Sequence, residues 1–236
     1  MERLRKGLPL LLLILFMLGG CGRMSGKNLE NEILGYLRDK HGEEFRLLRL
    51  TEENSGYEGH FLRAVCRSES IEDPFTLIVY EDLSFGEETA EIDGRTVGVR
   101  DEYPNVRLQR EYARLLREML PEAVFIGCTV ETTGRCYTAE EVDRGVEACA
   151  QIAEADATVT AYVIADAPDG TDTLFPRVES ALSALPFFRQ YLYFGRSLRD
   201  EDYWKEQFAE NYDRFDYHFM RSGLVADPVT FKIQAD

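Results

Sequence analysis

Hydrophobic positions near the start of the chain first repeat every three or four residues and then alternate. A helix is predicted over 28–40, because its apolar residues fall on one face and Gly42, of a type common just past helix ends, follows it. Alternating apolar, β-branched and aromatic residues come next, separated by polar turns, which predicts antiparallel strands. These strands are predicted over 45–50, 57–66 and 75–80, with a hairpin around Asp93-Gly94 over 91–96.

The helical period returns near residue 103, and predicted strands and helices then alternate. Apolar residues on one face, with Pro104 early and Pro121 just beyond, predict a helix over 103–120. The capping-box sequence Thr138-Ala139-Glu140-Glu141 predicts a helix that continues to Ala153. Further strands are predicted over 123–131, 157–166, 188–194 and 229–233, and further helices over 174–185 and 204–212.

This succession predicts an α+β fold with two subdomains. Residues 28–120 would form a helix plus an antiparallel sheet, and residues 121–236 a layered sheet in which strands alternate with helices. The change of rhythm near Pro121 places the predicted boundary there, and each part has the size of a small domain. One merged core is the alternative.

Composition and charge narrow the range of functions. The 236 residues include 27 Lys and Arg against 43 Asp and Glu, a formal net charge of −16, and 44% of them are hydrophobic. Such a composition is typical of a folded protein and not of a disordered or multi-pass membrane protein. Because an acidic chain is repelled by phosphates, we expect no nucleic-acid partner.

The first twenty residues differ from all the others. Arg3, Arg5 and Lys6 precede an unbroken apolar run over 8–18, and Gly19-Gly20-Cys21 follows. A helix of that run covers about 16 Å, roughly half of the hydrocarbon core of a bilayer. The segment is therefore interpreted as an export signal and not as a transmembrane anchor.

The end of this segment resembles the lipobox of bacterial lipoproteins, in the residues Leu18-Gly19-Gly20-Cys21. The resemblance implies that residues 1–20 are a signal peptide and that Cys21 becomes the diacylated N-terminus. Residues 21–27 would be a short tether, and the N-terminal lipid would hold the domain on the extracytoplasmic face of a bacterial membrane. The order of elements in the first half is also similar to cystatin-like and PepSY-like modules, in topology alone.

Recognisable catalytic and metal-binding motifs are absent from the sequence. It contains no nucleophile elbow, phosphate loop, dinucleotide fingerprint, zinc-protease motif or Cys-x-x-Cys pair. We therefore expect no catalytic residue, metal or cofactor, and favour a non-catalytic binding module that recognises an envelope glycan, a peptide or a membrane protein. The alternative is an envelope hydrolase built on two converging carboxylates. A transport solute-binding lipoprotein is disfavoured, because the chain is small for two lobes and a hinge.

The predicted helix over 103–120 carries a stripe of arginines at spacings of three and four residues. Because arginine forks match carboxylate and phosphate groups, this stripe is the candidate site for an anionic ligand. The alternative is that Glu111 and Glu118 pair with the arginines on a solvated helix face. The stripe consists of Arg107, Arg110, Arg114 and Arg117.

Aromatic and cysteine residues suggest two further features. Aromatic residues are concentrated between Phe187 and Phe219, where an exposed row would suit sugar rings or peptide side chains, although their spacing favours core packing. Cys128 and Cys136 bracket a predicted turn and are the pair that a disulfide would most easily join in an oxidising compartment. The alternative is that the cysteines after Cys21 are small buried hydrophobic residues.

Overall fold

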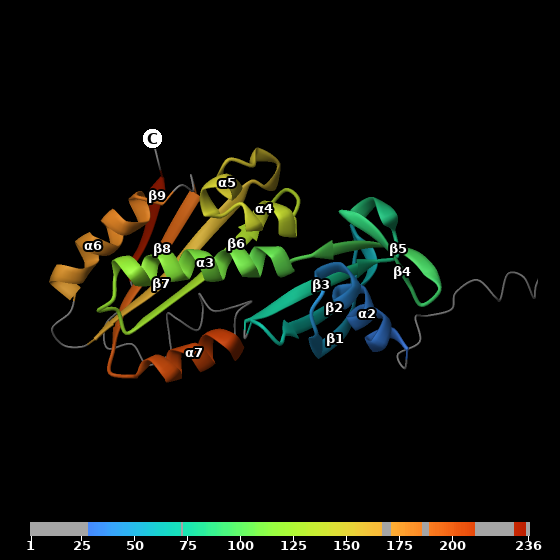
Figure 1. Cartoon of the computed structure of the whole chain (residues 1–236), viewed down its shortest axis with the longest axis horizontal. Coiled ribbons are helices and arrows are strands. Elements are labelled where there is room, and N and C mark those ends of the chain that lie inside the picture. Colours follow the sequence, from blue (N-terminus) through green and yellow to red (C-terminus); the bar gives the residue numbers. More distant parts are fainter. Residues whose placement is uncertain (1–27, 72, 167–170, 186–188, 211–228, 235–236) are drawn as a thin grey trace, which may run out of the picture.

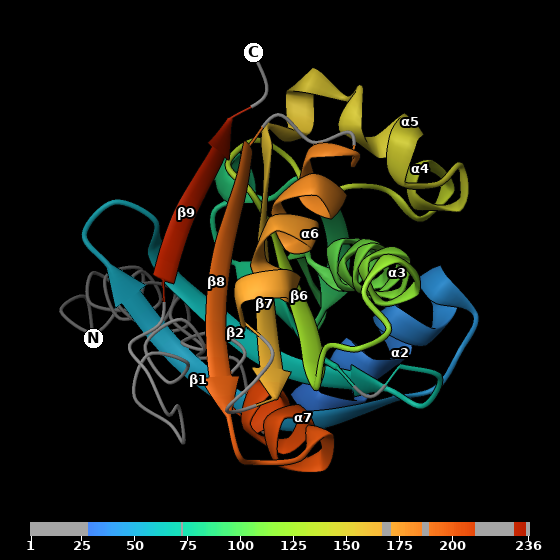
Figure 2. The same ribbon diagram turned by 90° about the vertical axis from the view of Figure 1, so that its left-hand side faces the viewer.

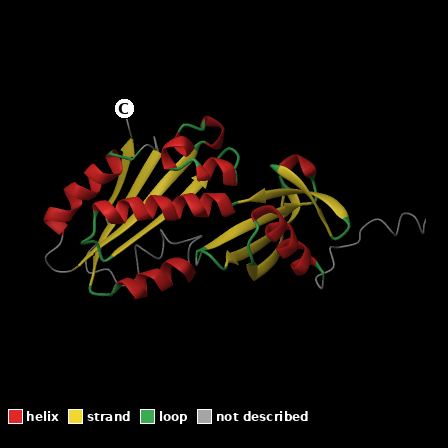
Figure 3. Ribbon diagram, in the orientation of Figure 1, coloured by secondary structure: helices red, strands yellow, loops and turns green. Residues whose placement is uncertain are grey.

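The fold contains two sheets that follow one another along the length of the molecule, each with its own helices (Figure 1, Figure 3). It is known from a computed structural model that describes residues 28–71, 73–166, 171–185, 189–210 and 229–234. The class is α+β, with an antiparallel sheet in the N-terminal half and a mixed sheet in the C-terminal half, which confirms the predicted fold class.

The first sheet has five antiparallel strands in the order β1-β2-β3-β5-β4, with one helix packed against it. The helix buries Leu29, Ile33 and Leu37 in a core shared with the sheet. The elements are α2 (Leu29–His41), β1 (Phe45–Ser55), β2 (Gly59–Ser68), β3 (Pro74–Tyr80), the 3-10 turn η1 (Leu83–Phe85), β4 (Glu88–Ile92) and β5 (Arg95–Asp101).

Two turns in this half form as the sequence predicts. Gly42 ends α2 with a left-handed backbone, φ +73°, and its N–H donates to the carbonyl of Arg38. Asp93 and Gly94 both have positive φ, +55° and +67°, at the tip of the β4–β5 hairpin. This geometry matches the right-handed twist of the two strands and explains the Asp-Gly sequence at this point.

The second sheet has four strands in the order β6-β7-β8-β9, and only β7 and β8 run parallel (Figure 2). Parallel neighbours need a crossover connection, and a helix supplies it here. The elements are α3 (Tyr103–Met119), β6 (Phe125–Thr132), α4 (Ala139–Asp143), α5 (Val146–Ala150), the 3-10 turn η2 (Ala153–Ala155), β7 (Ala157–Asp166), α6 (Thr171–Ser183), β8 (Arg189–Ser197), α7 (Glu201–Glu210) and β9 (Val229–Gln234).

Helices cover both faces of the second sheet. Alternate residues of β6, Ile126, Cys128 and Val130, share a core with buried residues of α3, α4, α5 and α6. Phe125, at the start of the same strand, belongs to a separate cluster with Trp204 and Phe208 of α7. Because successive side chains of a strand point to opposite faces, α7 covers the face opposite to α3.

Helix α3 belongs mainly to the second core, which shifts the boundary between the halves. Leu108, Tyr112 and Leu116 pack in that core, whereas Tyr103 and Val106 pack with the first sheet. The predicted boundary lies between residues 120 and 121. In the structure, the chain passes from the first core to the second at the first turn of α3. The physical reason is that the apolar stripe of α3 packs on β6, the strand that follows it.

The single helix predicted from Thr138 to Ala153 is wrong in its length. The capping box forms as predicted, since Thr138 and Glu141 each bond the other's backbone N–H. However, Gly145 has φ +93°, a conformation outside the helical region, and it separates α4 from α5. Glycine adopts this backbone without a Cβ clash, so the chain can turn there.

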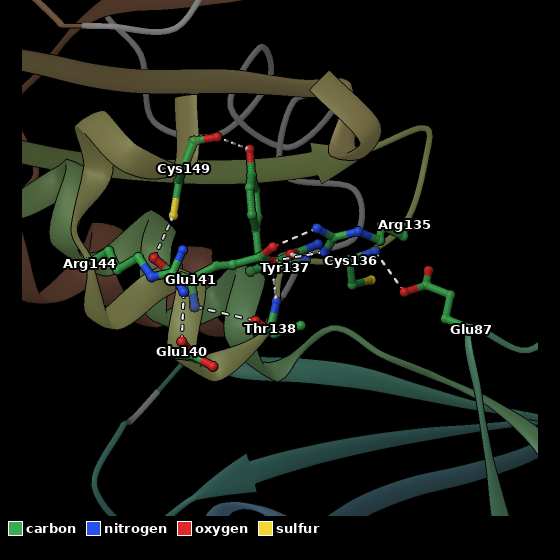
Figure 4. Close-up of polar contacts among 10 residues, drawn as sticks. Glu87, Arg135, Cys136, Tyr137, Thr138, Glu140, Glu141, Arg144 and Cys149 are labelled. Atoms are coloured by element: carbon green, nitrogen blue, oxygen red, sulfur yellow. Dashed lines mark hydrogen bonds and ion pairs between the residues drawn. The ribbon is translucent and has the colours of Figure 1, made fainter. Parts of the chain in front are cut away.

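Polar contacts join the two halves near the end of β6 (Figure 4). Arg100 of β5 donates to the Thr132 carbonyl at 2.9 Å, and the Cys136 N–H donates to the Glu87 carboxylate at 2.7 Å. Asn105 of α3 accepts from the Tyr137 N–H at 3.1 Å. These contacts fix the segment after β6 against the first sheet.

Candidate functional site

A cleft lies at the edge of β6, between α3 on one face of the second sheet and α7 on the other. It has a volume of about 310 Å³, and its floor is formed by consecutive residues of β6, from Phe125 to Cys128. Consecutive strand residues alternate between the two faces, so a cleft that all four line must lie along the strand's edge. Within the described chain, β6 is an edge strand of its sheet. We call this space the α3–α7 cleft.

Basic side chains from two helices converge on the α3–α7 cleft. Four basic residues line it together with two acidic residues, although the whole protein carries an excess of acidic groups. Gln109, Phe208 and residues of β6 complete the walls. The basic residues are Arg110, Arg114, Arg117 and Lys205, and the acidic ones are Asp73 and Glu201.

The arginines of α3 differ in their partners. Arg114 pairs with Glu111 at 2.6 Å and with Glu118, and the hydrogen bond to Glu111 raises its pKa. Arg117 pairs with Glu201 of α7 at 3.1 Å. Arg114 thus fits the alternative of ion pairing along the helix, whereas Arg117 pairs with a carboxylate of another helix.

Arg110 has no carboxylate partner among the residues that the structure describes. Its Nη1 donates to the Ser70 carbonyl at 3.3 Å, in the turn between β2 and β3. A carbonyl oxygen accepts a hydrogen bond but does not neutralise the guanidinium charge. Arg110 therefore brings to the cleft a guanidinium that is not paired with a carboxylate of the described residues.

Arg107, the first residue of the predicted stripe, lies apart from the cleft. Its Nη2 contacts the Asp143 carboxylate of α4 at 2.6 Å, and it does not line the cleft. The structure thus brings three of the four predicted arginines together, and the fourth is paired on the side of α3 that faces α4.

A second cleft also lies between α3 and β6, closer to the first sheet. It has a volume of about 340 Å³ and lies where the ends of β6 and β5 approach the first half of α3. Burial raises the pKa of the Glu102 carboxyl in this cleft, although the Arg100 guanidinium opposes the shift. We call it the junction cleft. Its polar lining residues are Arg63, Thr76, Arg100, Glu102, Asn105, Gln109, Thr129, Glu131 and Thr132.

Gln109 is the residue that both clefts share. It lines the α3–α7 cleft and the junction cleft, and its exposed fraction is 6%. Its amide makes no hydrogen bond to any protein group in the described part of the chain, whereas the neighbouring Asn105 bonds both Thr132 and Tyr137. The Gln109 amide atoms are not among the fully buried polar atoms that lack a hydrogen-bond partner in the described residues, so they are open to solvent within the clefts.

The cysteine pair predicted to form a disulfide does not form one. Cys66, Cys128, Cys136 and Cys149 are all free and buried. The Cys136 sulfur lies 3.8 Å from the Thr132 hydroxyl, and Thr132 is four residues along β6 from Cys128. Four strand residues span about 13 Å, well beyond the Cα separation that a disulfide allows. Burial raises the pKa of the Cys136 thiol to about 12, which favours its protonated form.

Some described aromatic residues of the C-terminal part are packed in the core, whereas Tyr191, Tyr193 and Tyr203 are half-buried. Trp204 has no exposed surface, and Phe208 is 6% exposed. Both pack against Phe125, so they provide no open ring face. Phe187, Phe188 and residues 211–219 lie outside the described residues, as does Cys21.

In residues 28–234, apart from the gaps given above, no three His, Cys, Asp or Glu side chains are grouped so that they could hold a metal ion. No helix in the same residues is both long and apolar enough to cross a bilayer.

Comparison with known proteins gives information about the fold only. No protein-family profile matches the sequence, and no curated protein matches it. Among solved structures, the chain is similar to the crystal structure of a DUF5037 family protein from Ruminococcus gnavus ATCC 29149. The TM-score is 0.55 and the identity 16%, and the match covers 86% of this chain and 89% of the other. The two chains therefore share an architecture over most of their lengths.

Reasoning from the sequence missed Lys205, Gln109 and the junction cleft. Gln109 had a signal, because it lies next to Leu108 and three residues before Tyr112 on the otherwise apolar, inward face of α3. Lys205 had none, because nothing in the sequence shows that α7 packs beside α3.

Proposed function

We propose that this protein is a lipid-anchored, non-catalytic binding module of the bacterial cell envelope that holds an anionic ligand in the α3–α7 cleft. The anchor rests on residues 1–21, whose pattern resembles a lipoprotein signal. The observation that carries the binding role is Arg110, a cation in the cleft without a carboxylate partner among the described residues.

The charge distribution supports an anionic ligand. A protein with net charge −16 has many carboxylates that could neutralise an arginine, yet Arg110 is hydrogen-bonded to a carbonyl. The Arg110 guanidinium would donate two N–H groups to a carboxylate or phosphate in the cleft. Such a charged pair of hydrogen bonds is stronger than a neutral hydrogen bond. Lys205 and Arg117 line the same cleft, where both pair with Glu201, at 3.2 and 3.1 Å.

Titration of the full chain in detergent with glutarate, a small dicarboxylate, tests the proposal. We expect Arg110→Ala to weaken glutarate binding about tenfold, since a hydrogen bond to a charged group contributes about 1.5–3 kcal/mol. Arg46→Ala is the matched control, because Arg46 is exposed on β1 and does not line the cleft. Equal affinity of wild type and Arg110→Ala, or no binding of glutarate by wild type, would contradict the proposed function.

A carboxylate-dependent envelope hydrolase is the second candidate. The observation that favours it is the junction cleft, in which Glu102, with its raised pKa, and Glu131 line the same space. A carboxyl with a raised pKa beside a second carboxylate is the arrangement that glycosidases use. Release of reducing ends from purified cell wall, lost in Glu102→Gln, would favour this candidate.

A further inference from the structure

The two clefts adjoin along α3 and β6. Residues 125–128 of β6 line the α3–α7 cleft, and residues 129–132 line the junction cleft, without a break. On α3, the lining residues run from Arg117 back to Asn105, and Gln109 belongs to both sets. At 1.5 Å per residue this stretch is about 18 Å long, the length of five or six residues of extended peptide.

The Gln109 amide stands at the point where the clefts meet. An amide offers two donors and one acceptor. Within the described residues no protein group pairs with the Gln109 amide, although the residue as a whole is 94% buried. A ligand that supplies both an acceptor and a donor in one plane would pair with this amide, and a peptide bond has that arrangement.

We propose that the ligand is a short anionic peptide, with one carboxylate at Arg110 and the adjoining peptide bond paired with the Gln109 amide. This inference rests on the proposed function and names its ligand class. Gln109 and Arg110 are consecutive on α3 and line the same cleft, so a carboxylate and the nearest amide of one residue can reach them together. The rest of the peptide extends into the junction cleft, where Asn105, Thr132 and Glu131 provide polar walls.

The packing of the aromatic residues favours a peptide over an acidic sugar. Sugar rings bind proteins through open aromatic faces as well as hydrogen bonds. The aromatic residues of the α3–α7 cleft, Phe125 and Phe208, are 3% and 6% exposed, so neither offers such a face. A peptide needs only the hydrogen-bonding groups and charges that the two clefts present.

Titration calorimetry of the full chain with two probes tests the inference. The probes are glutarate, which has carboxylates and no amide, and N-acetyl-alanyl-glutamate, which has carboxylates and two amides. We expect wild type to bind the dipeptide about tenfold more tightly than glutarate, because hydrogen bonds to the Gln109 amide are added. Gln109→Met, which keeps the side-chain length, should bind the dipeptide no more tightly than it binds glutarate.

Gln151→Met is the matched control, because Gln151 is exposed after α5 and lines neither cleft. It should bind both probes as wild type does. Thermal unfolding gives a second readout: Gln109→Met should unfold at about the wild-type temperature, because the amide makes no hydrogen bond to a protein group among the described residues. A clearly lower unfolding temperature would show that the protein itself satisfies the amide, and would overturn the inference.

The outcomes separate this inference from the proposed function. If glutarate binds in an Arg110-dependent way but the dipeptide has no advantage, or keeps its advantage in Gln109→Met, the peptide assignment fails and the anion site stands. Tighter binding of N-acetylmuramic acid than of the dipeptide would show that the ligand is an acidic sugar and not a peptide. If wild type binds no probe, both proposals fail.

Discussion

At the scale of single residues, the buried carboxylate of Asp101 joins the end of β5 to α2 and α3. It is 4% exposed at the end of β5, and its Oδ2 contacts His41 Nε2 at 2.7 Å and Lys40 Nζ at 2.8 Å, both at the end of α2. Its Oδ1 accepts from the Tyr103 N–H at 3.0 Å, at the start of α3. Burial acts to raise the pKa of Asp101, but the His41 hydrogen bond and the Lys40 charge outweigh it and hold the pKa below its usual value.

This environment predicts a pH-dependent contribution to stability. Because the folded pKa lies below the usual value of 3.8, Asp101 stabilises the fold above about pH 4, and the contribution is lost as the pH falls through the folded pKa. Asp101→Asn should lower the free energy of unfolding by about 2 kcal/mol at pH 7, a typical value for hydrogen bonds to a charged group. The difference from wild type should shrink at pH 3. Urea unfolding at both pH values measures it.

Glu140→Gln is the control for this prediction. Glu140 pairs with Arg144 at 2.6 Å, but its side chain is 82% exposed. An exposed ion pair contributes less than about 1 kcal/mol. An equal loss of unfolding free energy in the two variants at pH 7 would show that the burial of Asp101 does not strengthen its stabilising contacts.

At the scale of elements, α7 gives the α3–α7 cleft its second wall. Asp200 caps the helix by accepting from the Tyr203 N–H at 2.9 Å. Trp204 and Phe208, four residues apart, bury one face against β6 and β7. Gly127 leaves room for this packing, because a Cβ there would lie 3.1 Å from Phe208 Cδ2. The spacing predicts the helix, while its position beside α3 depends on this fit.

Phe208→Ala should therefore affect both stability and binding. We expect a loss of about 3 kcal/mol in the free energy of unfolding, as for other buried phenylalanines. Glutarate affinity should also fall, because a loosened α7 no longer holds Lys205 and Glu201 at the cleft. Glu206→Ala is the control, since Glu206 is exposed on the same helix. Unchanged glutarate affinity in a destabilised Phe208→Ala would show that α7 is not needed for the site.

At the scale of the whole molecule, the proposed anchor and the proposed site lie in different parts of the chain. Cys21 precedes the first described residue, Asn28, by seven positions. So short a tether reaches at most about 25 Å, which would keep the domain near the membrane. The ligand would therefore be met close to the lipid surface.

Cys21→Ser should release the protein from the membrane. Each buried methylene of an acyl chain contributes about 0.8 kcal/mol, and without lipid this attachment is lost. Expression in a bacterium, with palmitate labelling and separation of the membrane fraction, measures the change. Ser25→Ala, in the same tether, should stay labelled and membrane-bound. Persistence of label in Cys21→Ser would contradict the lipoprotein assignment.

The sequence by itself determined most helices and strands, because their periodicity, caps and turn residues act over a few neighbours. The Asp93-Gly94 hairpin, the Thr138 capping box and the end of α2 at Gly42 are local in this sense. The break at Gly145 was missed, since a glycine within an apolar stripe is compatible with a continuous helix until the backbone is known.

Only the tertiary structure decided which of these residues share a site. The sequence placed four arginines on one helix face, but the positions of Asp143, Glu201 and Ser70 determine which of them are neutralised and leave Arg110 without a carboxylate among the described residues. Likewise, Cys128 and Cys136 are close in sequence, but Cys136 lies beside Thr132 at the end of β6, four strand residues from Cys128. The physical reason is that charge compensation, burial and contact depend on distances between elements, which local patterns along the chain do not contain.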